Sequence, residues 1–261
     1  MKFLFTALLL LASMASLAQS WKEQIINDAK AIYEPLSITT FNKPLYFRIN
    51  ESSTVGGSAH HETDHLAIIL DKGLLKTPRL TPDGLRMLIC HELGHLFGGA
   101  PRKNVPAEWE GPTAEDGLSL MTSEGQADYY ASLVCFRKLL EIESSLSPKP
   151  DYQRAGARLK QKCETLAGYK KQKLQTCLRT GLAGEDFLKL AFDFPISCEK
   201  SDDSIAPHLI RDFYPDRQCR LDTIVNGALC SESHLMVLDF DRMEDNGCRH
   251  NYATRPACWY P

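Results

Sequence analysis

A His-Glu-Leu-Gly-His run at residues 91–95 is the part of this 261-residue chain that most directly indicates chemistry. On a helix, His91 and His95 lie about one turn apart, so both imidazole rings leave the same face and can bind one metal ion. Glu92 is turned by about 100° from His91 around the helix axis, which places its carboxylate beside the metal. That position suits a general base that takes a proton from a metal-activated water. An ordinary pair of surface or hydrogen-bonded histidines is the alternative.

A second pair of residues supplies the third protein ligand that a catalytic zinc ion needs. Glu124 and Asp128 are also four residues apart, which puts them on one face of a helix. Glu124 can complete a His-His-Glu ligand set, and Asp128 can accept a hydrogen bond from the far nitrogen of a ligating histidine. The alternative is that two acids near a helix N-terminus only interact favourably with the helix dipole.

Together, the HELGH and ExxxD motifs resemble those of the gluzincin zinc metallopeptidases, the group that includes thermolysin. The short N-terminal core is similar to that of minimal gluzincins and HtpX-like peptidases, and the resemblance covers about residues 55–140. It implies Zn²⁺ as cofactor, with the zinc ligands His91, His95 and Glu124, the catalytic base Glu92 and the supporting acid Asp128. It also implies an active-site helix below a small sheet whose edge strand holds an extended peptide, and by position we expect that edge strand at residues 66–70.

The chain also departs from these families. HtpX-like peptidases carry transmembrane helices, whereas no segment after the N-terminus reaches the roughly 18 consecutive apolar residues of a membrane span. Thermolysin-like enzymes have a long propeptide, and few residues precede His91 here. The families' downstream histidine or tyrosine, which stabilises the oxyanion, has no clear counterpart. Three residues are possible oxyanion or substrate contacts: His250 in the segment 245–250, and His208 and Arg220 in the segment 206–223.

Apolar spacing and capping residues predict the elements that position these side chains. We expect helices at 21–34, ended by Pro35, at 81–97, and from a capping box at Ser123 and Gln126 to about residue 141. Strands are expected at 44–50 and 66–70, a flexible loop at 56–59, and interrupted helices at 151–192. The predicted fold class is α+β: a small mixed sheet over the HExxH helix and a second ExxxD helix, followed by a helical, disulfide-rich C-terminal region.

The helix at 81–97 has clear signals at both ends. Thr81 and Pro82 begin it, and two glycines at 98–99 end it. Its apolar residues lie on the side away from the histidines, and we therefore expect the histidine face to be open to a cleft. The residues of this stripe are Leu85, Ile89, Leu93, Leu96 and Phe97.

The N-terminus has the pattern of a secretory signal peptide over residues 1–18. Lys2 precedes an apolar run at 3–11, and small residues at Ser16 and Ala18 predict cleavage before Gln19. A transmembrane anchor is the alternative. We expect export to the periplasm or the outside, with no stable membrane insertion after cleavage. The remaining chain divides at Pro148-Lys149-Pro150 into a metallopeptidase core, 19–147, and a cysteine-rich, mainly helical region, 148–261, which either stands alone or completes the core.

All nine cysteines lie after the predicted signal peptide. In an oxidising compartment most should pair, and the odd number leaves at least one without a partner in the chain. We expect Cys90 to be a buried thiol and Cys135 to pair with a cysteine of the C-terminal half, where seven of the nine lie.

The composition limits the function classes. A net charge of −3 and a pI of about 6.2 argue against a nucleic-acid partner. The sequence predicts an exported zinc-dependent metallopeptidase that acts on a peptide or protein substrate. One alternative is a catalytically inactive protein of the gluzincin fold that binds extended polypeptide in the cell envelope. Another is a disulfide-rich structural protein with a fortuitous motif.

Overall fold

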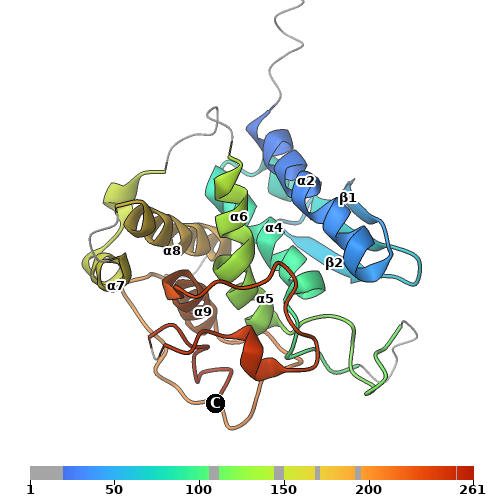
Figure 1. Cartoon of the computed structure of the whole chain (residues 1–261). Coiled ribbons are helices and arrows are strands. Elements are labelled where there is room, and N and C mark those ends of the chain that lie inside the picture. Colours follow the sequence, from blue (N-terminus) through green and yellow to red (C-terminus); the bar gives the residue numbers. More distant parts are fainter. Residues whose placement is uncertain (1–19, 106–111, 144–149, 168–170, 192–194, 251) are drawn as a thin grey trace, which may run out of the picture.

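The computed structural model describes residues 20–105, 112–143, 150–167, 171–191, 195–250 and 252–261 (Figure 1). Its first half contains helix α2 (Trp21–Phe41), the strands β1 (Leu45–Asn50), β2 (Gly57–His61) and β3 (Leu66–Asp71), and the helices α3 (Lys72–Lys76), α4 (Pro82–Phe97), α5 (Glu124–Tyr130) and α6 (Phe136–Glu141). A π-helical turn, η1 (Ala131–Cys135), joins α5 to α6. The second half contains η2 (Tyr152–Arg154), α7 (Ala157–Ala167), α8 (Lys171–Ala191), α9 (Arg217–Leu229) and η3 (Met243–Asn246). The predicted α+β class is confirmed.

The sheet of the described residues has three strands in the order β1-β3-β2. β1 runs parallel to β3, and β2 runs antiparallel to it. The prediction that residues 66–70 form the edge strand is wrong, because β3 is the central strand and its apolar residues are buried on both faces. The two edges of this sheet are β1 and β2, and a loop was expected over residues 56–59, where β2 lies. The sequence Gly-Ser-Ala-His-His lacks the apolar alternation by which strands are recognised.

Helix α4 lies at the centre of the molecule and packs against α2, α5, α8 and β2 (Figure 1). It begins as predicted, with the Thr81 hydroxyl accepting a hydrogen bond from the amide of Gly84. Every residue from Asp83 to Phe97 is buried. The expectation of an open histidine face is therefore wrong, because helices of the C-terminal half cover the side opposite the apolar stripe.

Several helix boundaries differ from the predicted ones. α2 continues through Pro35 to Phe41, whose ring packs against the Phe97 ring at 5.4 Å between centroids. α8 runs through Gly181 as one continuous helix, whereas interrupted helices were expected at 151–192. α9 lies in the region 148–261, which was expected to be mainly helical. The strand expected at 44–50 is confirmed as β1.

The two halves of the chain share one hydrophobic core. Leu93 of α4, Leu182 of α8 and Ile224 of α9 belong to the same buried cluster. The C-terminal region thus completes the core around α4. The predicted signal peptide, 1–18, and the proposed boundary at Pro148 and Lys149 lie outside the described residues. None of the described helices is long and apolar enough to cross a membrane.

Four disulfides connect the described elements. Cys90 of α4 pairs with Cys135 of η1, so the predictions of a free Cys90 and of a C-terminal partner for Cys135 are both wrong. These two cysteines lie on neighbouring helices, which sequence spacing alone does not reveal. The other pairs are internal to the C-terminal half: Cys163–Cys177, Cys219–Cys258 and Cys230–Cys248. Cys198 is buried and unpaired.

Removing the Cys90–Cys135 disulfide should destabilise the whole core, because it closes a loop of 45 residues between α4 and η1. A Cys90→Ala/Cys135→Ala variant should lose about 3–4 kcal/mol of unfolding free energy, as measured by urea denaturation under oxidising conditions. Cys198→Ala, which removes a buried cysteine without removing a disulfide, is the control. Equal losses of unfolding free energy in the two variants would show that the disulfide stabilises the fold no more than the packing of a buried cysteine side chain does.

Candidate metal centre

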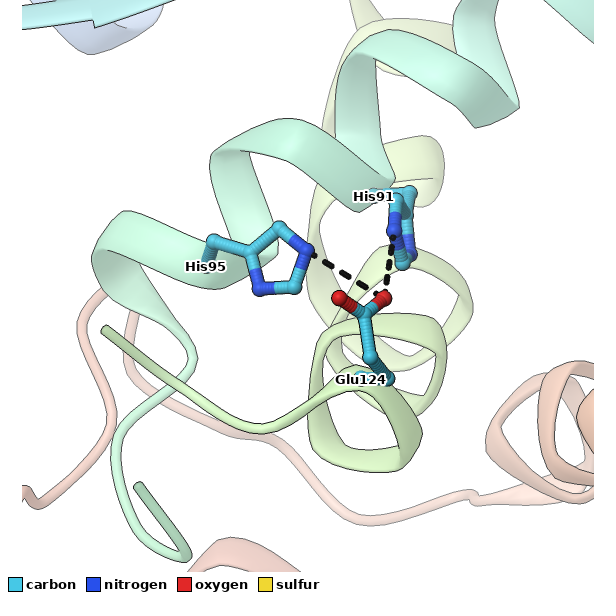
Figure 2. A group of neighbouring side chains, drawn as sticks. All are labelled: His91, His95 and Glu124. Atoms are coloured by element: carbon cyan, nitrogen blue, oxygen red, sulfur yellow. Dashed lines mark ion pairs between the residues drawn. The ribbon is translucent and has the colours of Figure 1, made fainter. Parts of the chain in front are cut away.

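The three predicted ligands, His91, His95 and Glu124, meet at the crossing of α4 and α5 (Figure 2). The Oε2 atom of Glu124 lies 3.3 Å from Nε2 of His91 and 3.4 Å from Nε2 of His95. Their ligand atoms all lie within 4.8 Å of one another. The three residues are only 3 to 5% exposed.

This arrangement fits a small divalent cation. Glu124 Oε2 is buried and has no hydrogen-bond partner among the described residues, which is costly for a carboxylate oxygen unless a cation compensates it. Two zinc–ligand bonds of about 2.1 Å at a tetrahedral angle separate their ligand atoms by about 3.4 Å. The measured nitrogen–oxygen distances are close to that value. Two further acid and cysteine groups in the described chain each contain both cysteines of a disulfide, which therefore offer no thiolate.

The partners of the other ring nitrogens orient both histidines toward this point. Nδ1 of His95 lies 2.8 Å from the carbonyl oxygen of Thr122, and Nδ1 of His91 lies 2.8 Å from a carboxylate oxygen of Asp128. Both partners can only accept, so the proton of each neutral imidazole belongs on Nδ1. The lone pair on each Nε2 is then free for a metal ion.

The charges around the ligands favour a cation between them. Lys103 contacts Oε1 of Glu124 at 2.7 Å and leaves Oε2 directed at the histidines. Although burial raises the pKa of Glu124, the histidines outweigh it and hold that pKa far below its usual range. Burial lowers the pKa of His91, but Asp128 and Glu124 raise it to about 9. A metal ion can take the place of the proton that these acids attract to His91.

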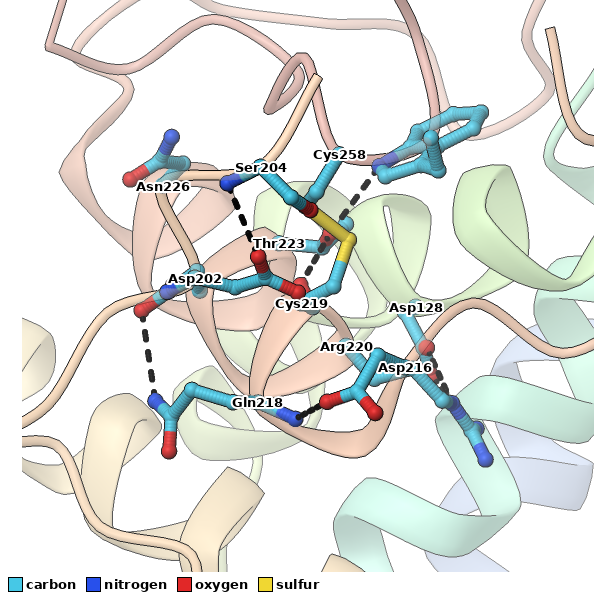
Figure 3. The surroundings of a disulfide bond; sticks show 12 residues. Asp128, Asp202, Ser204, Asp216, Gln218, Cys219, Arg220, Thr223, Asn226 and Cys258 are labelled. Atoms are coloured by element: carbon cyan, nitrogen blue, oxygen red, sulfur yellow. Dashed lines mark hydrogen bonds and ion pairs between the residues drawn. A yellow bond between two sulfur atoms is a disulfide. The ribbon is translucent and has the colours of Figure 1, made fainter. Parts of the chain in front are cut away.

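Asp128 is held by an arginine from the other half of the chain (Figure 3). Arg220 of α9 donates from Nε to Oδ2 at 2.6 Å and from Nη2 to Oδ1 at 2.9 Å. Both side chains are at most 4% exposed. The guanidinium also lies over the ring of Phe187 from α8, at 5.5 Å. Asp128, the predicted supporting acid, therefore lies between His91 of α4 and the buried Arg220 of α9.

Two glycines permit the helices to approach closely enough. A Cβ atom at Gly94 would lie 2.6 Å from the carbonyl oxygen of Ala127, so the glycine of HELGH is required where α5 crosses α4. A Cβ atom at Gly125 would lie 2.4 Å from the ring of Trp259. The Trp259 indole donates to Thr223 of α9, and the adjacent Cys258–Cys219 disulfide holds the C-terminal segment there (Figure 3).

Two other residues bear on the chemistry of the site. Glu92, the predicted general base, is 6% exposed. Tyr214 is 62% exposed, and the guanidinium of Arg220 lies 4.9 Å from its ring. Partial burial and the negative charges of Glu124 and Glu92, opposed by Arg220, raise the pKa of Tyr214 to about 12. Tyr214 and Lys103 belong to no spaced pattern, so the sequence alone does not indicate that they lie near the site.

The remaining predicted residues lie elsewhere. His208 and His250 are exposed, and no contact among the described residues joins either one to the three ligands. His250 stacks on Tyr252. The predicted capping box is absent. The Ser123 side chain makes no cap hydrogen bond, the Ser123 amide donates to the carbonyl oxygen of Pro101, and Oε1 of Gln126 accepts from Arg255.

Comparison of the chain with protein-family models, with curated proteins and with solved structures finds no match. The functional inference therefore depends on the geometry and chemistry of the site itself.

Arg220 should contribute to metal affinity through Asp128. Replacing it by methionine leaves a buried carboxylate without its partner, and the zinc dissociation constant should rise about 10- to 100-fold. Arg220→Lys, which keeps the charge but loses the two-point contact, should recover part of the affinity. Competition with a chromogenic chelator measures both variants, after circular dichroism has shown that they are folded.

The matched control is Arg154→Met, which removes a more exposed arginine with two hydrogen bonds to Asp186. It should leave zinc affinity unchanged. Wild-type affinity in Arg220→Met would exclude a role for Arg220 in positioning the ligand.

Proposed function

We propose that this protein is an exported zinc-dependent metallopeptidase in which His91, His95 and Glu124 bind the metal and Glu92 is the general base. The observation that carries the proposal is the buried Oε2 atom of Glu124, which has no hydrogen bond among the described residues and lies 3.3 and 3.4 Å from the Nε2 atoms of His91 and His95. Glu92 directly follows His91 and supplies the carboxylate that hydrolysis requires as a general base.

Each residue of the proposed site has its own role in hydrolysis. Zinc, when bound, is a Lewis acid that lowers the pKa of water and polarises a carbonyl group. Glu92 takes the proton released as the water oxygen attacks the carbonyl carbon of the peptide bond. It then delivers this proton to the amide nitrogen as the C–N bond breaks, which yields a carboxylic acid and an amine. Asp128 and Arg220 keep the His91 ring in its orientation.

The sheet edge supports a polypeptide as substrate. β2 is paired on one side only within the described chain, and it packs along α4, which carries both histidines. An extended peptide can add to such an edge through its own backbone hydrogen bonds. This mode of binding places a peptide bond alongside the metal-binding helix and depends little on side-chain identity.

Export is part of the proposal. The four disulfides suit an oxidising compartment, either the periplasm or the outside of the cell. The predicted signal peptide at 1–18 would direct the chain to that compartment.

A Glu92→Gln variant should keep its zinc and lose hydrolysis. The amide cannot accept the water's proton, so cleavage of casein or of a quenched fluorescent peptide library should fall at least about 100-fold. Elemental analysis should find the same zinc content in both proteins. Glu164→Gln, on the exposed face of α7, is the matched control and should cleave at the wild-type rate. Equal cleavage by Glu92→Gln and wild type would refute the mechanism.

One observation favours the alternative of an inactive protein that binds extended polypeptide. His91, Glu92 and His95 are only 3 to 6% exposed, which restricts the approach of a substrate to the metal. The same experiment separates the two functions. Peptides that bind to the zinc-loaded wild type but are never cleaved would support the binding protein.

A further inference from the structure

A cavity of about 670 Å³ lies at the C-terminal end of the edge strand β2. His61, the last residue of β2, lines it, and so does Arg102. The next residue, Lys103, binds the metal ligand Glu124 at 2.7 Å. The cavity thus borders the end of β2 and the residue that precedes Lys103, and its volume is in the range of small-ligand sites.

Apolar side chains make up part of the lining. The rings of Phe41 and Phe240 meet edge to face, with their centroids 6.1 Å apart, and Leu120 lies beside them. Such surfaces accept the methylene stem of a long side chain, and aromatic faces also attract cations.

The charge of the lining is negative where it meets solvent. Three carboxylates, Glu115, Asp116 and Asp241, face two cations, Lys43 and Arg102, so the lining is one positive charge short of neutrality. The cations are already engaged. Arg102 is buried and pairs with Asp116, and the Lys43 ammonium donates to a backbone carbonyl at 2.7 Å. The carboxylate of Asp241 is 89% exposed.

Two polar groups in the lining lack partners. Nε of Arg102, a side chain that is 5% exposed, and Nδ1 of His61 are buried without a hydrogen-bond partner. Burial and the charge of Lys43 lower the pKa of His61 to about 4, so His61 is neutral near pH 7 and adds no positive charge to the cavity.

We propose that this cavity is a substrate subsite that takes a lysine or arginine side chain of an extended polypeptide paired with β2. The stem packs on Phe41 and Phe240, and the cation meets Glu115 and Asp241 at the rim. This inference rests on the proposed function only in taking a polypeptide as the ligand. It adds a preference for basic residues that a backbone-paired edge alone would not produce.

Binding to the full-length, zinc-loaded Glu92→Gln protein tests the subsite without requiring cleavage. Fluorescein-labelled extended peptides carry a lysine at one position, moved along the chain, and matched peptides carry norleucine, which has the same stem without the ammonium group. At one position, lysine should bind about three- to tenfold more tightly by fluorescence anisotropy. An added Asp241→Asn/Glu115→Gln pair should abolish this difference. An added Glu164→Gln/Asp203→Asn pair, which removes two other exposed carboxylates, should retain it.

The outcomes distinguish the subsite from the peptidase. A lysine preference that the rim variant removes supports the subsite, even if the wild type cleaves nothing and the peptidase proposal fails. Equal binding of the lysine and norleucine peptides, or a preference unchanged in the rim variant, overturns the subsite, even if the wild type cleaves peptides. Absence of peptide binding also overturns it.

Discussion

Buried carboxylates at the centre of the molecule are the constraint on which the rest of the structure depends. Glu92, Glu124 and Asp128 are at most 6% exposed, and a buried carboxylate is tolerated only when cations or hydrogen bonds compensate it. Asp128 has Arg220 and His91, and one oxygen of Glu124 has Lys103. The other oxygen of Glu124 is left for a cation between the histidines. Satisfying these charges requires residues from both halves of the chain.

The same principle operates at the other end of α4. Asp83 and Arg86 of this helix form a buried ion cluster with Glu143 and with Arg179 of α8. α8 is thus fixed to the start of α4, while α9 is fixed near the candidate metal centre through Arg220. The start of the helix can be buried because Asp83 and Arg86 pair with each other and with charged residues outside α4. The C-terminal half therefore acts as a structural component of the site.

The parts of the site that are local in sequence could be predicted. His91, His95, Glu124 and Asp128 follow helical spacing, and Thr81 is a capping residue with a clear signal. Whether each plays its predicted role in catalysis stays a prediction. The α+β class could be predicted in the same way, from apolar spacing and a few strand patterns.

The parts that depend on tertiary contacts could not be predicted. β2 is a strand because it pairs with β3, and its own residues carry no strand pattern. Cys90 and Cys135 meet because two helices cross. Arg220 was singled out, but its contact with Asp128 joins residues from opposite halves of the chain. Pro35 indicated a helix end, whereas packing of Phe41 on the core continues the helix.

Metal content tests the central claim most directly. Elemental mass spectrometry on the oxidised protein, purified beside Glu124→Gln, should find about one zinc per wild-type chain and much less in the variant, because Glu124 supplies one of three protein ligands. Circular dichroism should show the same fold in both proteins. Equal zinc in the two would exclude Glu124 as a ligand, and no zinc in either would contradict a metal centre at the crossing of α4 and α5.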